Sequence, residues 1–213
     1  MRYQFISAKQ LESGILASLV SHGTLMVMPF IDPGRAHRTA QQLVQRADAE
    51  GLLLCIHDDL REGFVALVNR AFSSSTHPRV GYVAQDAYAG RGWLQRALEV
   101  CALQKPGLFA FNDGKWMGEL AGFGLVDREW ALGNYQGALF YPGYQSHYAD
   151  VELTLLAQND GRFAYEPNCV LIEVDPDKDQ KAVNPRDRER FRARQQNGFE
   201  ERVKNLALLG KFQ

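Results

Sequence analysis

The sequence predicts an α/β fold with a mostly parallel central sheet flanked by helices. Three short apolar runs, at residues 24–28, 52–56 and 80–84, have the length of buried strands. The segments between them carry apolar residues at helical spacing, and polar residues follow each run. Strands that are apolar on both faces are covered on both sides, which is typical of parallel sheets with crossover helices.

The composition is that of a globular protein without a strong overall charge. The chain has 213 residues, 46% of them hydrophobic, and a formal net charge of −1. This small charge gives no long-range field that recruits nucleic acid or acidic lipid. The three cysteines, Cys55, Cys101 and Cys169, lie in apolar runs, which predicts buried thiols in a reducing compartment.

The N-terminal segment does not have the pattern of a signal peptide, because Lys9 and Glu12 interrupt its apolar residues. No apolar run approaches the roughly 20 residues of a membrane-spanning helix. We therefore expect a cytoplasmic protein with no integral membrane segment.

The first element expected in chain order is a helix over residues 7–20. Ser7 is a suitable N-cap, and apolar residues then recur at helical spacing, at Leu11, Ile15, Leu16 and Leu19.

The strand at residues 24–28 follows and is expected to stop at Pro29. An amphipathic helix then covers residues 36–47 and ends by Gly51, where the second apolar run begins. A further helix is expected over residues 64–72. These elements give a strand–helix–strand–helix–strand order.

The third apolar run ends close to a lone carboxylate, Asp86. Gly90 and Gly92 mark a turn, and the next residues have the spacing of one helix face, at Trp93, Leu94, Ala97, Leu98 and Cys101. In open α/β sheets, ligands bind in the crevice at the carboxyl ends of the strands. Asp86 is therefore the first candidate site residue, although an aspartate here also suits a simple turn cap.

The second half is less regular. A short strand is expected at residues 108–111, and residues 116–141 are rich in glycine and aromatic residues. This composition fits either a mobile substrate loop or a small antiparallel subsheet. Asp150 is expected to N-cap a helix over residues 151–157. Two short strands, at residues 163–165 and 170–174, complete the region.

The character of the chain changes after residue 174. Residues 175–213 are predicted to form a solvated linker and a C-terminal helical extension, with Pro185 starting a helix. Four arginines at positions 188, 190, 192 and 194 fit a solvated helix with intrahelical ion pairs, or alternatively a lid or an anionic-ligand contact. Three leucines are expected to dock the tail onto the domain: Leu206, Leu208 and Leu209.

Four segments of residues 24–174 match, in order and spacing, the motifs of a known family. They are Met28-Pro29-Phe30; Asp58-Asp59 with Gly63 to Ala71; Val83 to Asp86 with Gly92-Trp93-Leu94; and Tyr148 to Leu153 with Gly161 to Pro167. The chain resembles the inverting family-2 glycosyltransferases of the GT-A fold. The resemblance implies that residues 1–174 form a GT-A-like domain for nucleotide-sugar binding and catalysis.

The resemblance also implies roles for individual residues. Asp150 matches the catalytic base, and Asp86 matches the acid that holds Mn²⁺ or Mg²⁺ on the donor diphosphate. Trp116 and Glu152 are expected on the acceptor side. The nucleotide is expected to contact residues that follow the first two strands: Pro29, Phe30, Asp32, Asp58 and Asn69.

The chain departs from the family pattern near both acids. Ala87 and Tyr88 follow Asp86 where the family often has a second acid, and Ala149 replaces a glutamate before Asp150. Glu173 and Asp175 stand where a histidine often closes the last strand. The metal shell is therefore either altered or completed by diphosphate oxygens and water.

Two other functions remain open. A sugar-phosphate nucleotidyltransferase shares this layout, although the loop ending in Arg35 is a poor match to its signature. A non-catalytic nucleotide-sugar-binding module is compatible with the altered acids. The acceptor is not identified, and a glycan, a lipid-linked sugar, a protein or a modified nucleic-acid base all fit.

Overall fold

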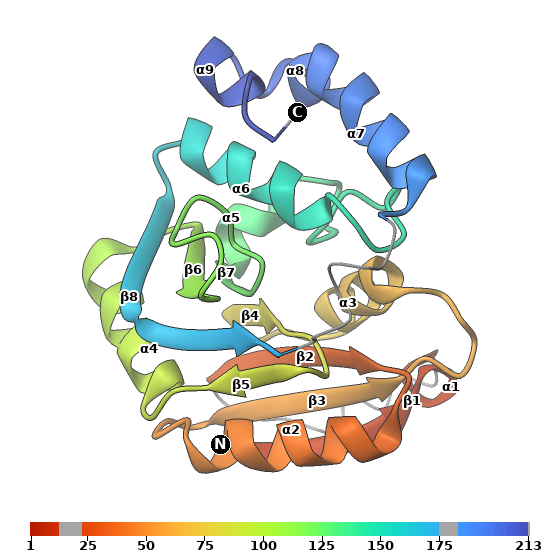
Figure 1. The fold of residues 1–213 in the computed structure, drawn as a ribbon, viewed down its shortest axis with the longest axis vertical. Coiled ribbons are helices and arrows are strands. Elements are labelled where there is room, and N and C mark those ends of the chain that lie inside the picture. Colours follow the sequence, from red (N-terminus) through yellow and green to blue (C-terminus); the bar gives the residue numbers. More distant parts are fainter. Residues whose placement is uncertain (13–22, 175–182, 213) are drawn as a thin grey trace.

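The computed structural model describes residues 1–12, 23–174 and 183–212, and these form one eight-stranded sheet with helices on both faces (Figure 1). The strand order is β1-β3-β2-β4-β7-β6-β8-β5. The predicted α/β class, with a mostly parallel sheet and flanking helices, is confirmed.

The first half is a parallel sheet with crossover helices. Strands β1, β3, β2 and β4 pair in parallel. Helices α2 and α3 connect consecutive strands of this half, as the apolar periodicity predicted. The bounds are β1 Arg2–Ser7, α1 Ala8–Glu12, β2 Thr24–Phe30, α2 Pro33–Gln45, β3 Gly51–His57, α3 Phe64–Ser73 and β4 Arg79–Tyr82.

The second half introduces antiparallel pairs. Strand β7 lies antiparallel between β4 and β6, and β8 pairs in parallel with β6 and antiparallel with the short β5. Part of the glycine- and aromatic-rich region thus joins the main sheet through β7. The bounds are β5 Ala87–Ala89, α4 Trp93–Gln104, β6 Leu108–Asn112, β7 Gly124–Asp127, α5 Arg128–Leu132, α6 Ala149–Asn159 and β8 Phe163–Glu173.

The C-terminal extension contains α7 Pro185–Gln196, α8 Gly198–Glu201 and α9 Leu206–Leu209. It lies on α6, on the far side from the central sheet (Figure 1). Pro185 starts α7 as expected, and Phe191, Phe199 and Val203 are buried in the same core cluster as α6. Leu208 and Leu209 pack against this cluster, whereas Leu206 is 82% exposed, so the expectation that Leu206 docks the tail is wrong.

Apolar side chains fill both faces of the sheet. In β2, Leu25 and Val27 belong to the cluster beneath α3 and α6, and Met26 and Met28 belong to the cluster beneath α2 and α4. This alternation follows from the two-residue period of a strand. It explains why the strand is apolar throughout.

The N-terminal prediction is partly wrong, because residues 2–7 form the edge strand β1 and the helix begins only at Ala8. Arg2, Tyr3 and Gln4 are exposed at the sheet edge, so the strand lacks a continuous apolar pattern. Ser7 does act as a cap, since its Oγ accepts a hydrogen bond of 3.2 Å from the Gln10 amide. Ile15, Leu16 and Leu19 lie outside the described residues.

Two prolines lie inside strands that were expected to stop beside them. β2 continues through Pro29 to Phe30, where only β3 remains as a partner because the pairing with β4 ends at Val27. A proline can occupy such a one-sided position without losing a ladder hydrogen bond. β8 likewise runs through Pro167 as one strand, with a register shift opposite β6.

Two other boundaries differ from the predictions. The third strand ends at Tyr82 rather than at residue 84, and α2 ends at Gln45, before Gly51. Most of the predicted linker, residues 175–182, lies outside the described residues. Among the described residues, no helix is long and apolar enough to cross a membrane.

Candidate active site

A cavity of about 550 Å³ opens between the start of α6, the loop before β7, the end of β4 and the C-terminal extension. Most of the side chains that line it are aromatic or apolar, and several polar side chains lie among them. The residues around it are Phe64, Tyr82, Ala84, Asp113, Lys115, Trp116, Leu120, Gly122, Phe123, Phe140, Ser146, His147, Tyr148, Ala149, Asp150, Val151, Glu173, Val183 and Phe212.

Asp86 lies in the turn between β4 and β5, two residues after Ala84, which lines this cavity. Its backbone oxygen accepts a hydrogen bond of 2.9 Å from the Val174 amide, and the next residue, Ala87, pairs with Glu173. The cavity is lined by Ala84 and Glu173 but not by Asp86 itself. Asp86 therefore lies one step behind the cavity wall.

One oxygen of Asp86 has an unusual environment. Its Oδ1 is buried, and none of the described residues gives it a hydrogen bond. Burying an unpaired carboxylate oxygen is costly, so such an atom marks a place for a donor or a cation. The described residues contain no group of three His, Cys, Asp or Glu side chains that could hold a metal without further ligands. The unpaired Asp86 oxygen can thus serve as a single protein ligand for a cation, and a cation there would need further ligands from outside the described side chains.

Gln85 joins the carboxyl ends of β2 and β4. Its Oε1 accepts hydrogen bonds of 3.0 Å from the amides of Ile31 and Asp32, and its backbone oxygen accepts one of 2.6 Å from Thr39 Oγ1. This amide fixes the turn that carries Asp86 against the loop after β2. The sequence analysis missed Gln85, and its position beside the candidate acid is the only signal that pointed to it.

Several residues that were expected to contact the nucleotide lie close together at the ends of β2 and β3. Pro29 and Phe30 are the last residues of β2, and the Phe30 ring stacks on His57 at 5.2 Å. Asp32 caps α2 by accepting a 3.0 Å hydrogen bond from the Arg35 amide, and this bond lowers the pKa of Asp32. None of these residues lines the cavity.

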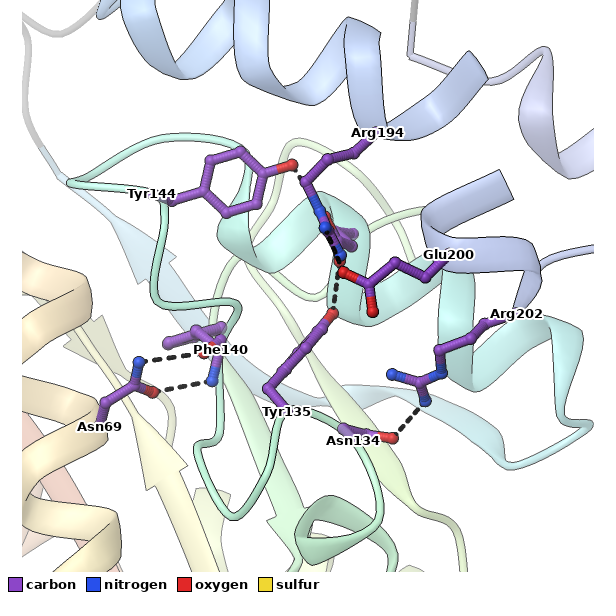
Figure 2. Close-up of polar contacts among 9 residues, drawn as sticks. Asn69, Asn134, Tyr135, Phe140, Tyr144, Arg194, Glu200 and Arg202 are labelled. Carbon is purple, nitrogen blue, oxygen red and sulfur yellow. Dashed lines mark hydrogen bonds and ion pairs between the residues drawn. The ribbon is translucent and has the colours of Figure 1, made fainter. Parts of the chain in front are cut away.

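Asp58 and Asn69 have structural partners. The two Asp58 oxygens accept hydrogen bonds of 2.8 and 2.9 Å from the amides of Glu62 and Gly63. The Asn69 side chain makes two hydrogen bonds to the backbone of Phe140 (Figure 2). Its Nδ2 donates to the Phe140 oxygen at 3.0 Å, and its Oδ1 accepts from the Phe140 amide at 2.8 Å. The Asn69 amide is thus engaged with protein, which argues against the expected nucleotide contact.

Asp150 lies in the first turn of α6 and lines the cavity. The prediction that it N-caps this helix is wrong, because the cap position is occupied by Tyr148 in a left-handed conformation (φ 66°) and the helix begins at Ala149. A carboxylate here lies at the positive end of the helix, which favours its ionised form. Burial raises the pKa of the neighbouring Tyr82, and the charge of Asp150 raises it further.

Of the two residues expected on the acceptor side, Trp116 lines the cavity and Glu152 does not. Trp116 lines the cavity, keeps 37% of its surface exposed and meets Phe212 edge-to-face at 5.7 Å. Glu152 is fully buried on the other side of α6 and does not line the cavity. The expectation that Glu152 contacts an acceptor is therefore corrected, since its carboxylate serves the protein interior.

Glu152 is the centre of a buried polar network. Its oxygens accept hydrogen bonds of 2.8 Å from the hydroxyls of Tyr135 and Tyr144, and of 2.8 and 2.7 Å from the guanidinium of Arg194. Arg194 also pairs with Glu200 at 2.8 Å (Figure 2). Burial and the negative charge of Glu152 raise the pKa of both tyrosines, so their hydroxyls stay protonated as donors.

The arginine-rich helix thus has two sides. Arg194 is turned inward and stacks 3.4 Å from the centre of the Tyr141 ring, whereas Arg188 and Arg192 are exposed. The predicted solvent exposure is found for Arg188 and Arg192 but not for Arg194, and Arg190 donates a hydrogen bond to the backbone oxygen of Gly143. Sequence reasoning missed this pair because Arg194 and Glu152 are 42 residues apart.

A second anchor from α7 holds the loop before α6. The buried carboxylate of Asp187 accepts hydrogen bonds of 3.0, 2.9 and 2.9 Å from three successive backbone amides, those of Gln145, Ser146 and His147. Two of these residues line the cavity. The extension therefore fixes both the loop and the helix that present Asp150.

The comparisons with known proteins show the fold. No protein-family model matches the chain, and no curated protein matches its sequence. A mannosyltransferase from Pyrobaculum calidifontis, in complex with GDP-Man and Mn²⁺, superposes with a TM-score of 0.54 and 14% identity, covering 80% of this chain and 60% of the other. The TarS 1–349 structure from S. aureus superposes with a TM-score of 0.57 and 10% identity over 73% and 61% of the two chains.

A third structure covers more of both chains. Glucosyl-3-phosphoglycerate synthase from Mycobacterium tuberculosis, in complex with Mg²⁺ and UDP, has a TM-score of 0.50 and 11% identity over 84% of this chain and 80% of its own. This chain has a GT-A-like fold. It spans only about 60% of the mannosyltransferase and of TarS 1–349, so their activities and substrates are not transferred with the fold.

Proposed function

We propose that this chain is a glycosyltransferase that moves a sugar from a nucleotide-diphosphate sugar to an acceptor, with inversion and with the help of Mn²⁺ or Mg²⁺. The observation that carries the proposal is the placement of two carboxylates at one cavity of a GT-A-like fold. Asp150 lines the cavity, and Asp86, which has a buried, unpaired oxygen, lies just outside the lining, two residues after Ala84. The similar structures with GDP-Man and Mn²⁺, and with UDP and Mg²⁺, support the same chemistry.

The donor is assigned to the carboxyl ends of β2, β3 and β4. The loop after β2 packs on the nucleoside, and Gln85 keeps that loop next to Asp86. Asp86 is the ligand for the cation, with Glu173 beside it across the β5–β8 pair. When bound, the cation offsets the negative charge of the departing diphosphate.

Asp150 is the general base. Its carboxylate takes the proton from the acceptor hydroxyl as that oxygen bonds to the anomeric carbon. The bond from the anomeric carbon to the diphosphate breaks, and its electron pair leaves with the diphosphate. Because attack and departure occur on opposite faces, the configuration at the anomeric carbon inverts. The positive end of α6 favours the ionised carboxylate that a base needs.

A non-catalytic nucleotide-sugar-binding module is the second candidate. It is supported by the altered acid pattern, since Ala87 and Tyr88 follow Asp86 and Ala149 precedes Asp150. A binding module and an enzyme both bind the donor, but only the enzyme releases nucleoside diphosphate.

The test is a panel of UDP- and GDP-sugars, screened by thermal shift with Mn²⁺ and with EDTA, because a bound ligand stabilises the native state. The hits are then assayed for release of nucleoside diphosphate, and the anomer formed is determined by NMR. Mn²⁺-dependent release with an inverted product supports the proposal. Binding without release supports the module, and binding of none of the donors overturns both.

A further inference from the structure

Two aromatic residues from distant parts of the chain form one corner of the cavity. Trp116 comes from the loop before β7, and Phe212 from the C-terminal end of the extension. Their rings meet edge-to-face at 5.7 Å with an interplanar angle of 75°. Trp116 still exposes 37% of its surface although it is packed against Phe212.

This corner is held in place on both sides. Asp113 Oδ1 accepts hydrogen bonds of 2.9 and 2.8 Å from the amides of Lys115 and Trp116, which fixes the turn that carries the indole. Lys211, next to Phe212, pairs with Glu119 at 2.8 Å and accepts a 2.9 Å hydrogen bond from Gln195 on its backbone oxygen. Aromatic groups that are already ordered lose little entropy on binding a ligand.

The polar groups of the cavity set its chemistry. Asp113, Ser146, His147 and Glu173 line it together with Asp150. Some of these groups already have protein partners: Ser146 Oγ lies 2.9 Å from His147 Nδ1, and Asp113 Oδ1 accepts two backbone amides. A hydrocarbon chain would still displace water from polar atoms of the lining and offer no hydrogen-bonding atoms in its place, at a cost in free energy. A sugar ring suits the mixture, because its C–H face packs on an aromatic ring while its hydroxyls bond to carboxylate, hydroxyl and imidazole groups.

We propose that the acceptor is a saccharide whose ring packs against Trp116, and that Phe212 of the C-terminal extension is a specificity-determining residue for it. This inference rests on the proposed glycosyltransferase function and names the acceptor class of the same site. The C-terminal extension then contributes a substrate-contacting residue to the active site.

The test uses saturation-transfer NMR on the full chain with three probes, the methyl glycosides of glucose, mannose and N-acetylglucosamine. Saturation transfer to the ring hydrogens of at least one probe is expected. It is expected to fall severalfold in Trp116→Ala and in Phe212→Ala, and to be largely restored in Trp116→Phe. The matched control is Leu206→Ala, which removes an 82% exposed apolar side chain from the same extension and leaves the signal unchanged.

Two results overturn the inference. One is no transfer to any of the three glycosides, and the other is transfer that is the same in Trp116→Ala and Phe212→Ala as in the parent chain. Donor binding by the same variants separates this failure from a failure of the proposed function. A chain that binds a nucleotide sugar with Mn²⁺ but gives either result keeps the transferase proposal and loses the saccharide acceptor. A chain that binds no nucleotide sugar loses the transferase proposal and, with it, the acceptor role.

Discussion

Replacing Arg194 with alanine should destabilise the protein strongly, because the change leaves the Glu152 charge buried without its cationic partner. The Glu152 side chain is fully buried and that of Arg194 is 11% exposed. Removing one member of such a pair typically costs about 3–5 kcal/mol. The two tyrosine hydroxyls remain as donors to Glu152, so we expect a value near the lower end, about 3 kcal/mol.

The assay is urea unfolding of the parent chain and of the variant. The midpoint should shift while the denaturant slope stays the same, because the surface exposed on unfolding is nearly unchanged. Arg192→Ala is the matched control on the same helix, and its exposed side chain should change stability by no more than about 0.5 kcal/mol. Equal effects of Arg194→Ala and Arg192→Ala would refute the reasoning.

A double-mutant cycle identifies the partner. Glu152→Ala and Arg194→Ala should each destabilise the chain, and the double variant should lose less than the sum because the pair is in direct contact. A coupling energy of about 0.5–3 kcal/mol is expected. Additive losses would show that the guanidinium stabilises α7 by some other contact, such as its stacking on Tyr141.

The remaining predictions concern the site and the thiols. Asp86→Asn should lower Mn²⁺-dependent nucleotide affinity by roughly 10-fold or more in calorimetry and keep the fold, and an unchanged Mn²⁺ requirement would remove Asp86 as the ligand. Asp150→Asn should lower turnover by roughly 100-fold with donor affinity nearly unchanged, whereas full turnover would make Asp150 structural. Burial raises the pKa of Cys55 from 9.0 to about 12 and that of Cys101 to about 11, so at pH 8 iodoacetamide should label them in urea but not in the native chain. The pKa values are raised only in the folded state, so the protonated thiols contribute stability that is fully present below about pH 9. This contribution is lost as the pH rises toward 11–12. A free energy of unfolding that does not change between pH 9 and pH 12 would argue against buried thiols.

The sequence predicted the elements whose burial is uniform. β2 and β3 are buried along nearly their whole length, so they appear as continuous apolar runs. β1 was missed because its residues are mostly exposed at the edge of the sheet. β7 was anticipated only as part of a small antiparallel subsheet, because four residues at the end of a glycine-rich loop carry too little pattern to be assigned to a strand.

The site was predictable to the extent that it depends on strand ends. Asp86 was named from its position after a strand and Asp150 from the family motif around residues 148–153; Asp150 lines the cavity and Asp86 lies beside it. The role of Glu152 was not predictable, because its partners Tyr135, Tyr144 and Arg194 are brought to it only by the folded chain. From the sequence alone, a glutamate two residues after Asp150 could contact a ligand or belong to the core, because the helix face on which it lies is not known.

The most direct test of the central claim is a crystal structure with Mn²⁺ and the nucleoside diphosphate that the donor screen selects, measured at the manganese absorption edge. The account predicts an anomalous peak about 2 Å from Asp86 Oδ1, with the diphosphate between this peak and the cavity that Asp150 lines. Nucleotide bound away from the carboxyl ends of β2 and β4, or a manganese peak remote from Asp86, would contradict it.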